Sequence, residues 1–493
     1  MIIKIEQIDE VYLRFYSEPS IEQELSDFFT YEYPGARFTP AFRAKLWDGK
    51  VRLADINRKT LYVGLLNYVY TFAERNGYTI KLLSPVHVTN NINYQQIEEF
   101  TKQLNPYGRG EPIVIRDYQI EAITEALDKN RVLLLSPTAS GKSFIIYSIM
   151  RWHLEHKRKC IIIVPTTSLV EQLYTDFEDY SSENKFDVQN YCQKLYSGFT
   201  KEIEKDVMIS TWQSIHKQPK SWFSQFDVVF GDEAHQFKAS SLSATMGKMT
   251  NVKYRIGTTG TIDNHKCHKL VLEGMFGPIY KVTTTKQLME TKTLAELKII
   301  CLVLQYDEIT RRARKNNQYQ DEMEFLVSQD KRNKFIANLA LKQNGNTLVL
   351  FQYINHGKDI LKLVKDILEN TSRKLFYVSG EVNAEGREFI RKECENENNA
   401  IIVASFGTFS TGVNIPSIEN IIFASPYKSR IRNLQSIGRG LRKKDGKNVC
   451  TLYDIADDLS WKSWKNHTLR HLAERIKTYS EEKFNFKIIK LDI

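Results

Sequence analysis

Two successive series of apolar segments, each alternating with longer helix-like stretches, constrain the fold of this chain more than any other feature. Segments that are apolar at nearly every position are typical of parallel strands covered by helices on both faces. The pattern therefore predicts an α/β protein with two similar parallel-sheet domains and a cleft between them. The segments are VLLL (132–135), CIIIVP (160–165), VMIST (207–211), DVVFGDE (227–233) and YRIGTTG (254–260), then TLVLFQ (347–352), KLFYVSG (374–380), AIIVASF (400–406), NIIFASP (420–426) and VCTLYDI (449–455).

The start of the chain carries a shorter and more mixed pattern. Strand-like segments (VYLRFY, KVRLAD, YTIKLL) alternate there with helix-like ones (IEQELSDFF, GLLNYVYTFAERNG). The stretch NPYGRGEP at 105–112 concentrates proline and glycine, which favours a linker, and the stretch at 311–325 is strongly polar. We therefore predict four parts: a small α+β N-terminal domain (1–105), a first α/β domain (106–285), an inter-domain connection (286–330) and a second α/β domain (331–493).

The composition excludes several classes of protein. Hydrophobic residues make up 42% of the chain, which is too many for a disordered protein. No apolar run approaches the roughly 20 residues that a membrane-spanning helix needs. The first ten residues, MIIKIEQIDE, alternate apolar and polar side chains and carry acids, unlike a signal or transit peptide. We therefore expect a cytoplasmic protein without a membrane partner.

Basic residues are concentrated in two segments. Residues 37–59 hold seven basic and two acidic residues, and residues 425–447 hold eight basic and one acidic. Residues 1–36, by contrast, hold two basic and eight acidic residues. The net charge of +10 favours a polyanionic partner, and contacts with phosphates require such local concentration of charge. For either segment alone, a solvated basic face is an equally good interpretation.

A phosphate-binding loop is the strongest local signal. The segment SPTASGKS (136–143) lies between the apolar VLLL and the helix-like FIIYSIMRWHLE, and backbone N–H groups at such a helix N-terminus can hold phosphates. Lys142 would reach the β- and γ-phosphates, and the Ser143 hydroxyl would bind Mg²⁺. Ser136 stands where the usual pattern has its first glycine. The other candidate nucleotide-binding residues of the loop are Thr138, Ser140 and Gly141.

A second signal is GDEAH (231–235), which follows the strand-like DVVF. Ligands of α/β sheets bind at the carboxyl ends of the strands, where this segment would lie. Asp232 would hold Mg²⁺ through water, and Glu233 would polarise the water that attacks the phosphate. An acidic pair after a strand is more often a helix cap, but its place after a phosphate loop favours catalysis.

A third signal is QSIGRGLR (435–442). Arg439 and Arg442 are three residues apart, so on a helix they share a face. Arginines that project from the second domain could stabilise the charge on the γ-phosphate during its transfer. On its own, this segment would fit a solvated basic helix better.

These three segments, in this order and on two α/β series, resemble the superfamily 2 helicases over roughly residues 112–455. The resemblance implies two tandem RecA-like domains, ATP and Mg²⁺ as cofactors, and a nucleic acid as the polymer. IRDYQ (115–119) is similar to the element that reads the adenine base in that family, which implies nucleotide contacts by Tyr118 and Gln119.

Further segments are similar to weaker motifs of the family: VPTTSLVEQ (164–172), STWQS (210–214), GTTGT (257–261) and ASFGTFSTGVNIP (404–416). Each segment alone also fits a plain turn or a helix cap. By the resemblance, the DNA-contacting residues are Thr166, Thr211, Trp212, Ser379 and Thr408. The residues that couple hydrolysis to movement are His235, Thr258, Thr259, Thr411 and Gln435. Gly412 and Asn414 are expected near the nucleotide, with Asn414 where the family commonly has Asp.

A narrower resemblance covers nearly the whole chain. Residues 37–66 and 475–486 look like segments of the phage helicases of recombination and repair. This implies branched DNA substrates such as forks, Holliday junctions and R-loops, 3′ to 5′ movement, and action in the host cytoplasm during recombination, repair and replication. The DNA-binding candidates of the N-terminal domain are Arg43, Lys45, Trp47 and Lys50.

Basic and aromatic residues interleave in this N-terminal segment, which suits a surface that stacks bases and neutralises phosphates. Phe38 and Phe42 fit the core of a small domain equally well, whereas Trp47, beside Asp48 and Gly49, is the better candidate for exposure.

Three functions stay open at this point. The first is a monomeric, ATP-driven motor that separates the strands of DNA, with RNA–DNA hybrids as further partners. The second is an ATP-gated protein that clamps or anneals DNA without moving. The third is the motor of a restriction or chromatin-type complex, which moves along duplex without separating it. The motor motifs do not distinguish RNA from DNA, so the expectation of DNA rests on the narrower resemblance and the N-terminal basic segment.

Overall fold

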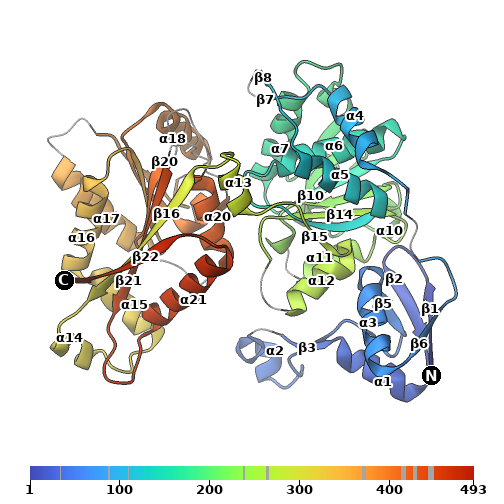
Figure 1. Ribbon diagram of the computed structural model, residues 1–493, viewed down its shortest axis with the longest axis horizontal. Coiled ribbons are helices and arrows are strands. Elements are labelled where there is room, and N and C mark those ends of the chain that lie inside the picture. Colours follow the sequence, from blue (N-terminus) through green and yellow to red (C-terminus); the bar gives the residue numbers. More distant parts are fainter. Residues whose placement is uncertain are drawn as a thin grey trace. The chain divides into compact units, whose positions relative to one another are not determined.

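The computed structural model describes the chain except for these residues: 34, 87–88, 109, 237–238, 263–265, 369–372, 383, 412–417, 426–429 and 442–448. Its contacts divide the chain into two units, one of residues 1–136 and 141–283 and one of residues 137–140 and 284–493. Each unit contains a seven-stranded parallel sheet, and the first also contains a four-stranded sheet (Figure 1). The predicted fold class is confirmed: two tandem parallel-sheet α/β domains with a small α+β domain at the N-terminus.

The N-terminal domain is a four-stranded sheet of order β5-β2-β1-β6. β1 lies antiparallel to β2 and parallel to β6. Alternate residues of a strand face opposite sides, so Ile3, Ile5, Leu13 and Phe15 enter the core while their neighbours face outward. The elements are β1 (Ile2–Gln7), β2 (Tyr12–Tyr16), α1 (Pro19–Phe28), β5 (Thr60–Tyr62), η2 (Val63–Leu65), α3 (Leu66–Asn76) and β6 (Thr79–Leu82).

The core of this domain continues into α12 (Lys266–Phe276), a helix of the first large sheet. Leu270 and Val271 of α12 belong to the same hydrophobic cluster as the N-terminal sheet. Tyr68 also donates a hydrogen bond to the Glu273 carboxylate at 2.7 Å. Gly64 lies so close to the Glu273 carbonyl that any side chain there would overlap it. The N-terminal domain is therefore packed onto the helices of the first sheet.

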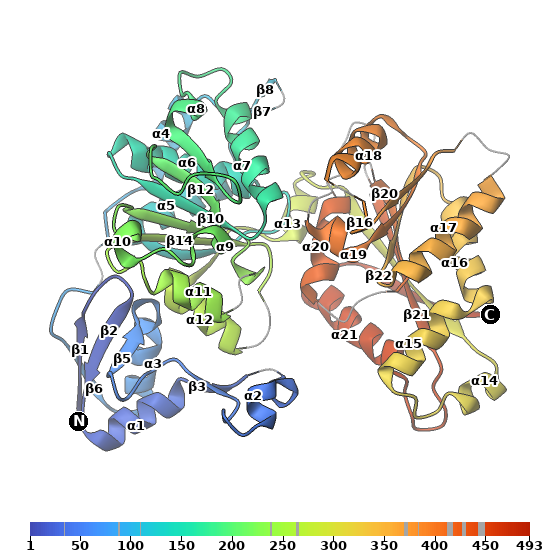
Figure 2. The same cartoon turned by 180° about the vertical axis from the view of Figure 1, so that it is seen from behind.

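Residues 30–52 form an appendage of the N-terminal domain (Figure 2). Its two strands pair antiparallel, and two short helices lie between them in the chain. The elements are β3 (Thr30–Glu32), η1 (Ala36–Phe38), α2 (Pro40–Arg43) and β4 (Lys50–Arg52).

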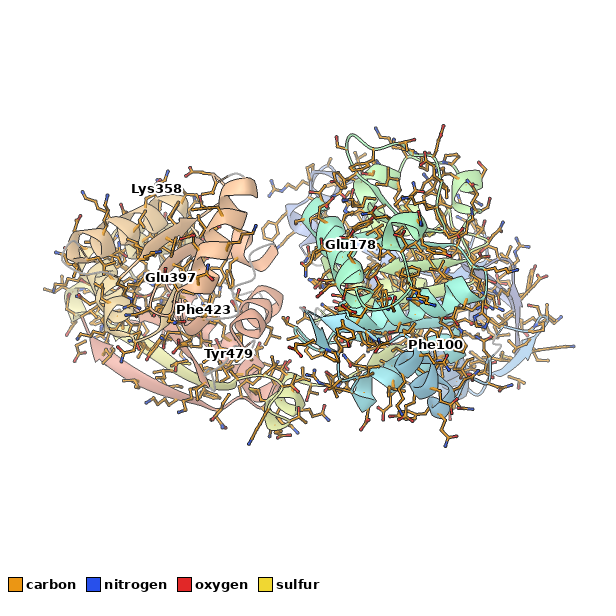
Figure 3. All side chains as sticks on the ribbon, turned by 90° about the horizontal axis from the view of Figure 1, so that it is seen from above. Phe100, Glu178, Lys358, Glu397, Phe423 and Tyr479 are labelled. Atoms are coloured by element: carbon orange, nitrogen blue, oxygen red, sulfur yellow. The ribbon has the colours of Figure 1, made fainter. Side chains whose placement is uncertain are left out.

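Within residues 105–112, where the sequence favoured a linker, two short strands pair with each other. β7 (Tyr107–Gly108) and β8 (Glu111–Pro112) pair antiparallel. The preceding helix α4 (Tyr94–Gln103) is part of the first large core, in which Phe100, labelled in Figure 3, packs edge-on against Trp152 with ring centroids 5.0 Å apart. β7 contacts α7 (Thr167–Tyr180), a helix of the first large sheet, so the hairpin packs on that domain.

The first large sheet has the strand order β11-β12-β10-β13-β14-β9-β15, with every paired strand parallel. Alternate residues of β10 enter different hydrophobic clusters: Ile162 packs with α5 to α7, and Ile161 with α10 to α12. Helices therefore cover both faces, which explains the nearly continuous apolar strands. The strands are β9 (Arg131–Leu135), β10 (Cys160–Val164), β11 (Cys192–Leu195), β12 (Val207–Thr211), β13 (Val228–Gly231), β14 (Tyr254–Thr259) and β15 (Ile279–Lys281). The helices are α5 (Asp117–Lys129), α6 (Lys142–Glu155), α7 (Thr167–Tyr180), α8 (Val188–Tyr191), α9 (Trp212–Ile215), α10 (Lys220–Phe223), η3 (Ala234–Gln236), α11 (Ala239–Met246) and α12.

The second large sheet has the order β18-β19-β17-β20-β21-β16-β22, again parallel throughout its pairs. Phe423 of β20 and Tyr479 of α21, both labelled in Figure 3, are fully buried in this unit. The strands are β16 (Glu296–Gln305), β17 (Asn346–Phe351), β18 (Leu375–Val378), β19 (Ile401–Ser405), β20 (Ile418–Phe423), β21 (Val449–Asp458) and β22 (Phe486–Asp492). The helices are α13 (Thr285–Glu290), α14 (Glu308–Ala313), α15 (Tyr319–Ser328), α16 (Asp330–Lys342), α17 (Ile354–Leu368), α18 (Ala384–Asn396), α19 (Phe406–Thr411), α20 (Arg430–Gly440) and α21 (His467–Glu481).

All ten apolar segments named from the sequence contain a strand. The two large sheets also contain four strands that the sequence did not predict: β11, β15, β16 and β22. β16 lies within residues 286–330, where the sequence suggested a connection, and pairs with β21 and β22. The boundaries between the four predicted parts stay a prediction. Within the described part of the chain, no helix combines the length and the apolar character needed to cross a membrane.

Candidate active site

Three segments named from the sequence meet at one edge of the first sheet: the phosphate loop and GDEAH, predicted at the nucleotide, and GTTGT, predicted to couple hydrolysis to movement. β13, β14 and β9 are neighbours in that order, and all three are parallel. The phosphate-loop segment follows β9, GDEAH begins at the last residue of β13, and GTTGT overlaps the end of β14. Because the carboxyl ends of parallel strands lie together, this edge is where a ligand of such a sheet binds.

The phosphate loop has an unusual backbone. Ala139 and Gly141 have φ of 65° and 85°, in the left-handed region, and Gly141 is the residue directly before α6. The Ser140 hydroxyl donates to the Pro137 carbonyl at 2.6 Å. Ser136, which replaces the usual first glycine, is buried, and its N–H donates to the Thr259 carbonyl at 2.8 Å. The loop therefore leads directly into the N-terminus of α6, and N–H groups at a helix N-terminus suit an anion.

Lys142 and Glu233 are brought together by this arrangement. The Lys142 ammonium forms an ion pair with the Glu233 carboxylate at 2.7 Å, and both side chains are mostly buried. Glu233 has a left-handed φ of 48°, which only a few per cent of non-glycine residues adopt. Such strain is concentrated at functional sites. The two groups predicted to bind the γ-phosphate and to orient the attacking water thus lie within contact distance.

Asp232 is buried next to this pair. Its carboxylate accepts a hydrogen bond from the Thr258 hydroxyl at 2.6 Å. Burial raises the pKa of Asp232, and the neighbouring Glu233 charge adds to the rise. The Lys142 charge and the Thr258 hydrogen bond act in the opposite direction, since both favour the carboxylate form. The protein therefore keeps a carboxylate in a place where desolvation opposes its charge.

His235 and Thr259 connect the acidic segment to β14. The His235 Nδ1 lies 2.7 Å from the Thr259 hydroxyl and 3.4 Å from the second Glu233 oxygen. Burial lowers the pKa of His235, although the Glu233 carboxylate opposes this shift. The predicted coupling residues His235, Thr258 and Thr259 therefore all contact the acidic segment or one another.

Gln119 lies directly against the phosphate loop. Its side-chain amide is so close to Gly141 that any side chain at residue 141 would overlap it. The Gln119 Oε1 accepts a hydrogen bond from the Arg116 N–H at 3.0 Å, and the Tyr118 hydroxyl accepts one from the Arg116 guanidinium at 2.9 Å. The phosphate loop is therefore in contact with the segment predicted to read the base, and the left-handed φ of 85° at residue 141 favours glycine there.

The residues predicted to bind Mg²⁺ offer suitable donors. Ser143 supplies a hydroxyl in the first turn of α6, and Asp232 supplies a carboxylate. Both are the hard oxygen donors that Mg²⁺ prefers. Mg²⁺ usually keeps several waters and phosphate oxygens besides one or two protein ligands. The pair fits this pattern, and the described residues include no larger cluster of His, Cys, Asp and Glu that would hold a metal.

The first sheet places its predicted DNA contacts on neighbouring strands at the same edge. Thr166 follows β10 and Thr211 ends β12, and the two strands are parallel partners. Thr211 is buried, with its hydroxyl 2.9 Å from that of Ser214, and Trp212 begins α9 with its ring edge-on to His216. Sequence reasoning missed Gln213, whose amide donates to the Pro165 carbonyl at 3.3 Å and so joins the two segments. Its position inside STWQS was the available signal.

In the second unit, Ser379 and Thr408 follow the neighbouring strands β18 and β19. Both are buried, and the Ser405 hydroxyl donates to the Thr408 hydroxyl at 2.8 Å. Thr411 lies on α19, while Gln435 and Arg439 lie on α20; their side chains fall outside the described part of the structure. Gly412, Asn414 and Arg442 also lie outside the described residues. The roles predicted for these residues stay predictions.

The appendage brings three of the four N-terminal candidates together. Arg43, Lys45 and Trp47 line a shallow hollow, and Lys50 is exposed on β4. The Trp47 indole donates to the Lys50 carbonyl at 2.9 Å and packs edge-on against Tyr33, so it is only partly exposed. The exposure expected of Trp47 is found instead at Phe38 and Phe42, which are 64% and 37% exposed. Neither phenylalanine is core because the appendage is too small to enclose it.

Fold and site together define a class of protein. A lysine–serine phosphate loop, a buried aspartate and a strained glutamate lie on one parallel sheet, and a second sheet of the same kind follows in the chain. This combination is that of the superfamily 2 helicases, which are nucleic-acid motors that hydrolyse ATP.

Comparisons with known proteins identify the family. Three family models match: "DNA helicase UvsW, N-terminal" over residues 2–82, "Type III restriction enzyme, res subunit" over residues 112–264, and "Helicase conserved C-terminal domain" over residues 330–444. The ATP-dependent DNA helicase uvsW of Enterobacteria phage T4 is 36% identical, with 99% of each chain covered. The DNA 3′-5′ translocase XPB2 of Sulfurisphaera tokodaii is 25% identical, covering 68% of this chain and 80% of its own. The crystal structure of T4 UvsW matches with a TM-score of 0.54, 34% identity and full coverage of both chains. The chain belongs to the UvsW family of superfamily 2 DNA helicases.

Proposed function

We propose that this DNA helicase hydrolyses ATP at the edge of the first sheet and uses the energy to move 3′ to 5′ and remodel branched DNA. The single observation that carries the proposal is the cluster of Lys142, Glu233, Asp232 and Thr258 beside the phosphate loop. These are the groups that phosphoryl transfer to water needs, already within contact distance of one another.

The proposed chemistry assigns one task to each side chain. Lys142 exchanges its ion pair with Glu233 for the β- and γ-phosphates, which leaves the Glu233 carboxylate to orient the attacking water. Ser143 and Asp232 would hold Mg²⁺, which supplies neutralisation of the phosphate charge when it is bound. The N–H groups at the start of α6 bind the phosphate oxygens. We propose that Arg439 and Arg442 contribute further positive charge from the second domain.

Hydrolysis can be transmitted along β14. Thr258 and Thr259 are the last two residues of this strand, and they contact Asp232 and His235 respectively. Loss of the γ-phosphate changes the charge next to Asp232 and Glu233. The hydrogen bonds of Thr258 with Asp232 and of Thr259 with His235 are the contacts of β14 nearest to that change. We propose that they couple hydrolysis to movement on the DNA.

The proposed substrate and direction rest on the family. The T4 relative is named a DNA helicase and the Sulfurisphaera relative a DNA 3′-5′ translocase. The appendage adds exposed aromatic and basic side chains at Phe38, Arg43 and Lys45, which suit unpaired bases beside phosphates. Forks and R-loops present such bases next to duplex, and Holliday junctions belong to the proposal through the resemblance to the phage helicases of recombination and repair. Monomeric action, a role in phage recombination, repair and replication, and a place in the host cytoplasm belong to the same proposal.

The rate of ATP hydrolysis should depend on the structure of the DNA that is present. ATPase activity should be stimulated most by forked and four-way-junction DNA, less by duplex and single strands, with RNA–DNA hybrid measured in parallel.

Lys142→Ala should abolish ATPase and strand displacement while leaving DNA affinity within a few-fold of the wild type. Lys185→Ala, an exposed lysine beyond α7, serves as the matched control and should behave as the wild type. Full activity of Lys142→Ala would refute the assignment of the site.

A second candidate function is movement along duplex without strand separation. The match of residues 112–264 to the res subunit of type III restriction enzymes favours it. Displacement of a third strand from a triplex, in the absence of fork unwinding, would identify this activity. Strand displacement that is independent of ATP would instead indicate a clamp or an annealing protein.

A further inference from the structure

The loop that joins β21 to α21 carries an unusual group of side chains. Its sequence is SWKSWK at residues 460–465, which we call the tryptophan hairpin. The Trp461 N–H donates to the Trp464 carbonyl and the Trp464 N–H donates to the Trp461 carbonyl, both at 3.0 Å. Lys462, at the tip, has a left-handed φ of 53°. The backbone therefore closes a tight turn on an antiparallel pair of tryptophans.

This closure presents both indoles together. Residues directly opposite in an antiparallel pair project from the same face. Trp461 and Trp464 are each partly exposed, and Lys462, Ser463 and Lys465 are exposed. Tryptophan is a costly residue to leave in contact with water, because its large apolar surface favours burial. Two indoles and two ammonium groups within six residues match the pattern of stacking platform and phosphate contact found where proteins bind single-stranded nucleic acid.

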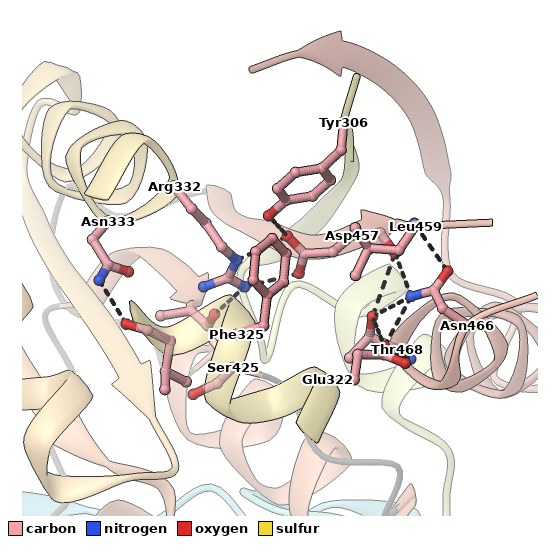
Figure 4. A network of polar contacts seen from close by, with 12 residues as sticks. Tyr306, Glu322, Phe325, Arg332, Asn333, Ser425, Asp457, Leu459, Asn466 and Thr468 are labelled. Carbon is pink, nitrogen blue, oxygen red and sulfur yellow. Dashed lines mark hydrogen bonds and ion pairs between the residues drawn. The ribbon is translucent and has the colours of Figure 1, made fainter. Parts of the chain in front are cut away.

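A buried network holds the C-terminal end of the hairpin (Figure 4). Asn466 accepts a hydrogen bond from the Leu459 N–H at 3.1 Å and donates to the Glu322 carboxylate at 2.8 Å. Glu322, from α15, also accepts hydrogen bonds from the N–H groups of His467 and Thr468, both at 2.8 Å. The first turn of α21 is thus satisfied by a carboxylate, which also suits the positive end of the helix.

The N-terminal end is held just as firmly. Asp457, at the end of β21, accepts from the Arg332 guanidinium at 2.8 and 3.0 Å and from the Tyr306 hydroxyl at 2.9 Å (Figure 4). The Arg332 and Asp457 side chains are each only 2% exposed. Both ends of the hairpin are therefore fixed by buried polar contacts, and rigid support of this kind preorganises a binding surface.

The hairpin lies at the edge of the second sheet that already carries the predicted DNA contacts. It follows β21, while Ser379 follows β18 and Thr408 follows β19, and these strands are parallel members of one sheet. From β18 to β21 there are four strand spacings, or roughly 19 Å. That distance corresponds to about five or six nucleotides of a stacked strand at about 3.4 Å each.

We propose that the tryptophan hairpin is a binding site for single-stranded DNA, in which Trp461 and Trp464 stack on bases and Lys462 and Lys465 contact the flanking phosphates. Single strands are the expected ligand because duplex hides the faces of its bases. The proposal rests on the proposed function, in which the chain moves along DNA, and adds a contact beyond those of the helicase motifs.

The test measures binding of the full chain to a labelled oligothymidine by fluorescence anisotropy. Trp461→Ala/Trp464→Ala should weaken binding by about 10- to 100-fold, since one or two stacked bases are lost. Trp461→Phe/Trp464→Phe keeps two aromatic faces and should stay within about threefold of the wild type. Affinity for blunt duplex should change little in either variant.

A charge series provides the matched comparison. Lys462→Ala/Lys465→Ala should reduce the slope of log affinity against log salt by about 1.4, because each phosphate contact on a single strand contributes about 0.7. Lys298→Ala/Lys487→Ala removes two exposed lysines near the amino ends of β16 and β22, and should leave the slope unchanged. An equal reduction of the salt slope in the two double-lysine variants would overturn the proposed binding site.

Two further results would overturn the proposal. One is oligothymidine binding by the double alanine variant within twofold of the wild type. The other is an equally large loss with phenylalanine and with alanine, which would mean that the indoles support the loop. Failure of the proposed function is a separate result, since it would appear as wild-type ATPase activity that DNA does not stimulate.

Discussion

Asp232 shows how closely the charge of the active site depends on single contacts. Burial and the Glu233 charge raise its pKa, whereas Lys142 and the Thr258 hydroxyl favour its ionised form. The function proposed for Asp232, holding a cation, requires the carboxylate. The ionised form of Asp232 is therefore stabilised by the hydroxyl of Thr258, which donates a hydrogen bond to it from the neighbouring strand at 2.6 Å.

Thr258→Val should move the acid limb of the ATPase profile to higher pH. The hydroxyl stabilises the ionised carboxylate, so its loss raises the pKa of Asp232 further, and protonation then begins at a higher pH. A hydrogen bond to a charged group contributes about 1.5–3 kcal/mol, which corresponds to a displacement of about one pH unit or more. The measurement is kcat against pH at saturating ATP. Thr258→Ser, which keeps the donor, should retain the wild-type profile, and an acid limb unmoved in Thr258→Val would contradict the argument.

The sequence named the residues of this site but not their contacts. Lys142, Asp232 and Glu233 could be chosen because their motifs follow apolar strands in the required order. The ion pair of Lys142 with Glu233 could not, since it depends on the left-handed backbone of Glu233. Exposure was also misjudged: Trp47 is held by a hydrogen bond to Lys50, and Phe38 is the more exposed ring. Ion pairing and side-chain exposure at these positions depend on tertiary contacts, which leave no pattern in the sequence.

At the level of elements, strands buried on both faces were the easiest to predict. β10 and β13 are apolar at nearly every position because helices cover the sheet on both sides. β11 and β22 lie at the edges of their sheets, where polar side chains such as Gln193 and Lys487 are tolerated, so they carry no such pattern. β16 is strongly apolar, but its place after the first series concealed that it joins the second sheet.

Arg332→Met should destabilise the second unit by about 3–5 kcal/mol, because it leaves the buried Asp457 carboxylate without its charged partner. α16 would lose its connection to the end of β21 as well. The measurement is the free energy of unfolding of the full chain in urea. Lys334→Ala, on the same helix, breaks only an exposed ion pair with Asp330 and should cost less than about 1 kcal/mol. A cost below about 1 kcal/mol for Arg332→Met would contradict the predicted contribution of the buried Arg332–Asp457 ion pair to stability.

At the level of the whole molecule, one chain combines three parts with different tasks. The first unit carries Lys142, Ser143, Asp232 and Glu233 of the site proposed for ATP. It also carries, packed on its helices, an N-terminal domain with an aromatic and basic appendage. The second unit carries a sheet of the same kind, with the tryptophan hairpin at its carboxyl edge. The apolar series in the sequence predicted both large sheets. The packing of the N-terminal domain onto α12 was not predictable, since it rests on Gly64 and on scattered residues that carry no periodic pattern.

One carboxylate at the edge of the first sheet, that of Glu233, is proposed to make ATP hydrolysis available for work on DNA. Glu233→Gln tests it, because the amide keeps the size of the side chain but lacks the charge that orients water and pairs with Lys142. The measurement is ATP turnover together with unwinding of a labelled fork. We expect the variant to bind ATP and DNA, to hydrolyse ATP at least about 100-fold more slowly, and to leave the fork intact. Unwinding and hydrolysis by Glu233→Gln at the wild-type rate would contradict the account.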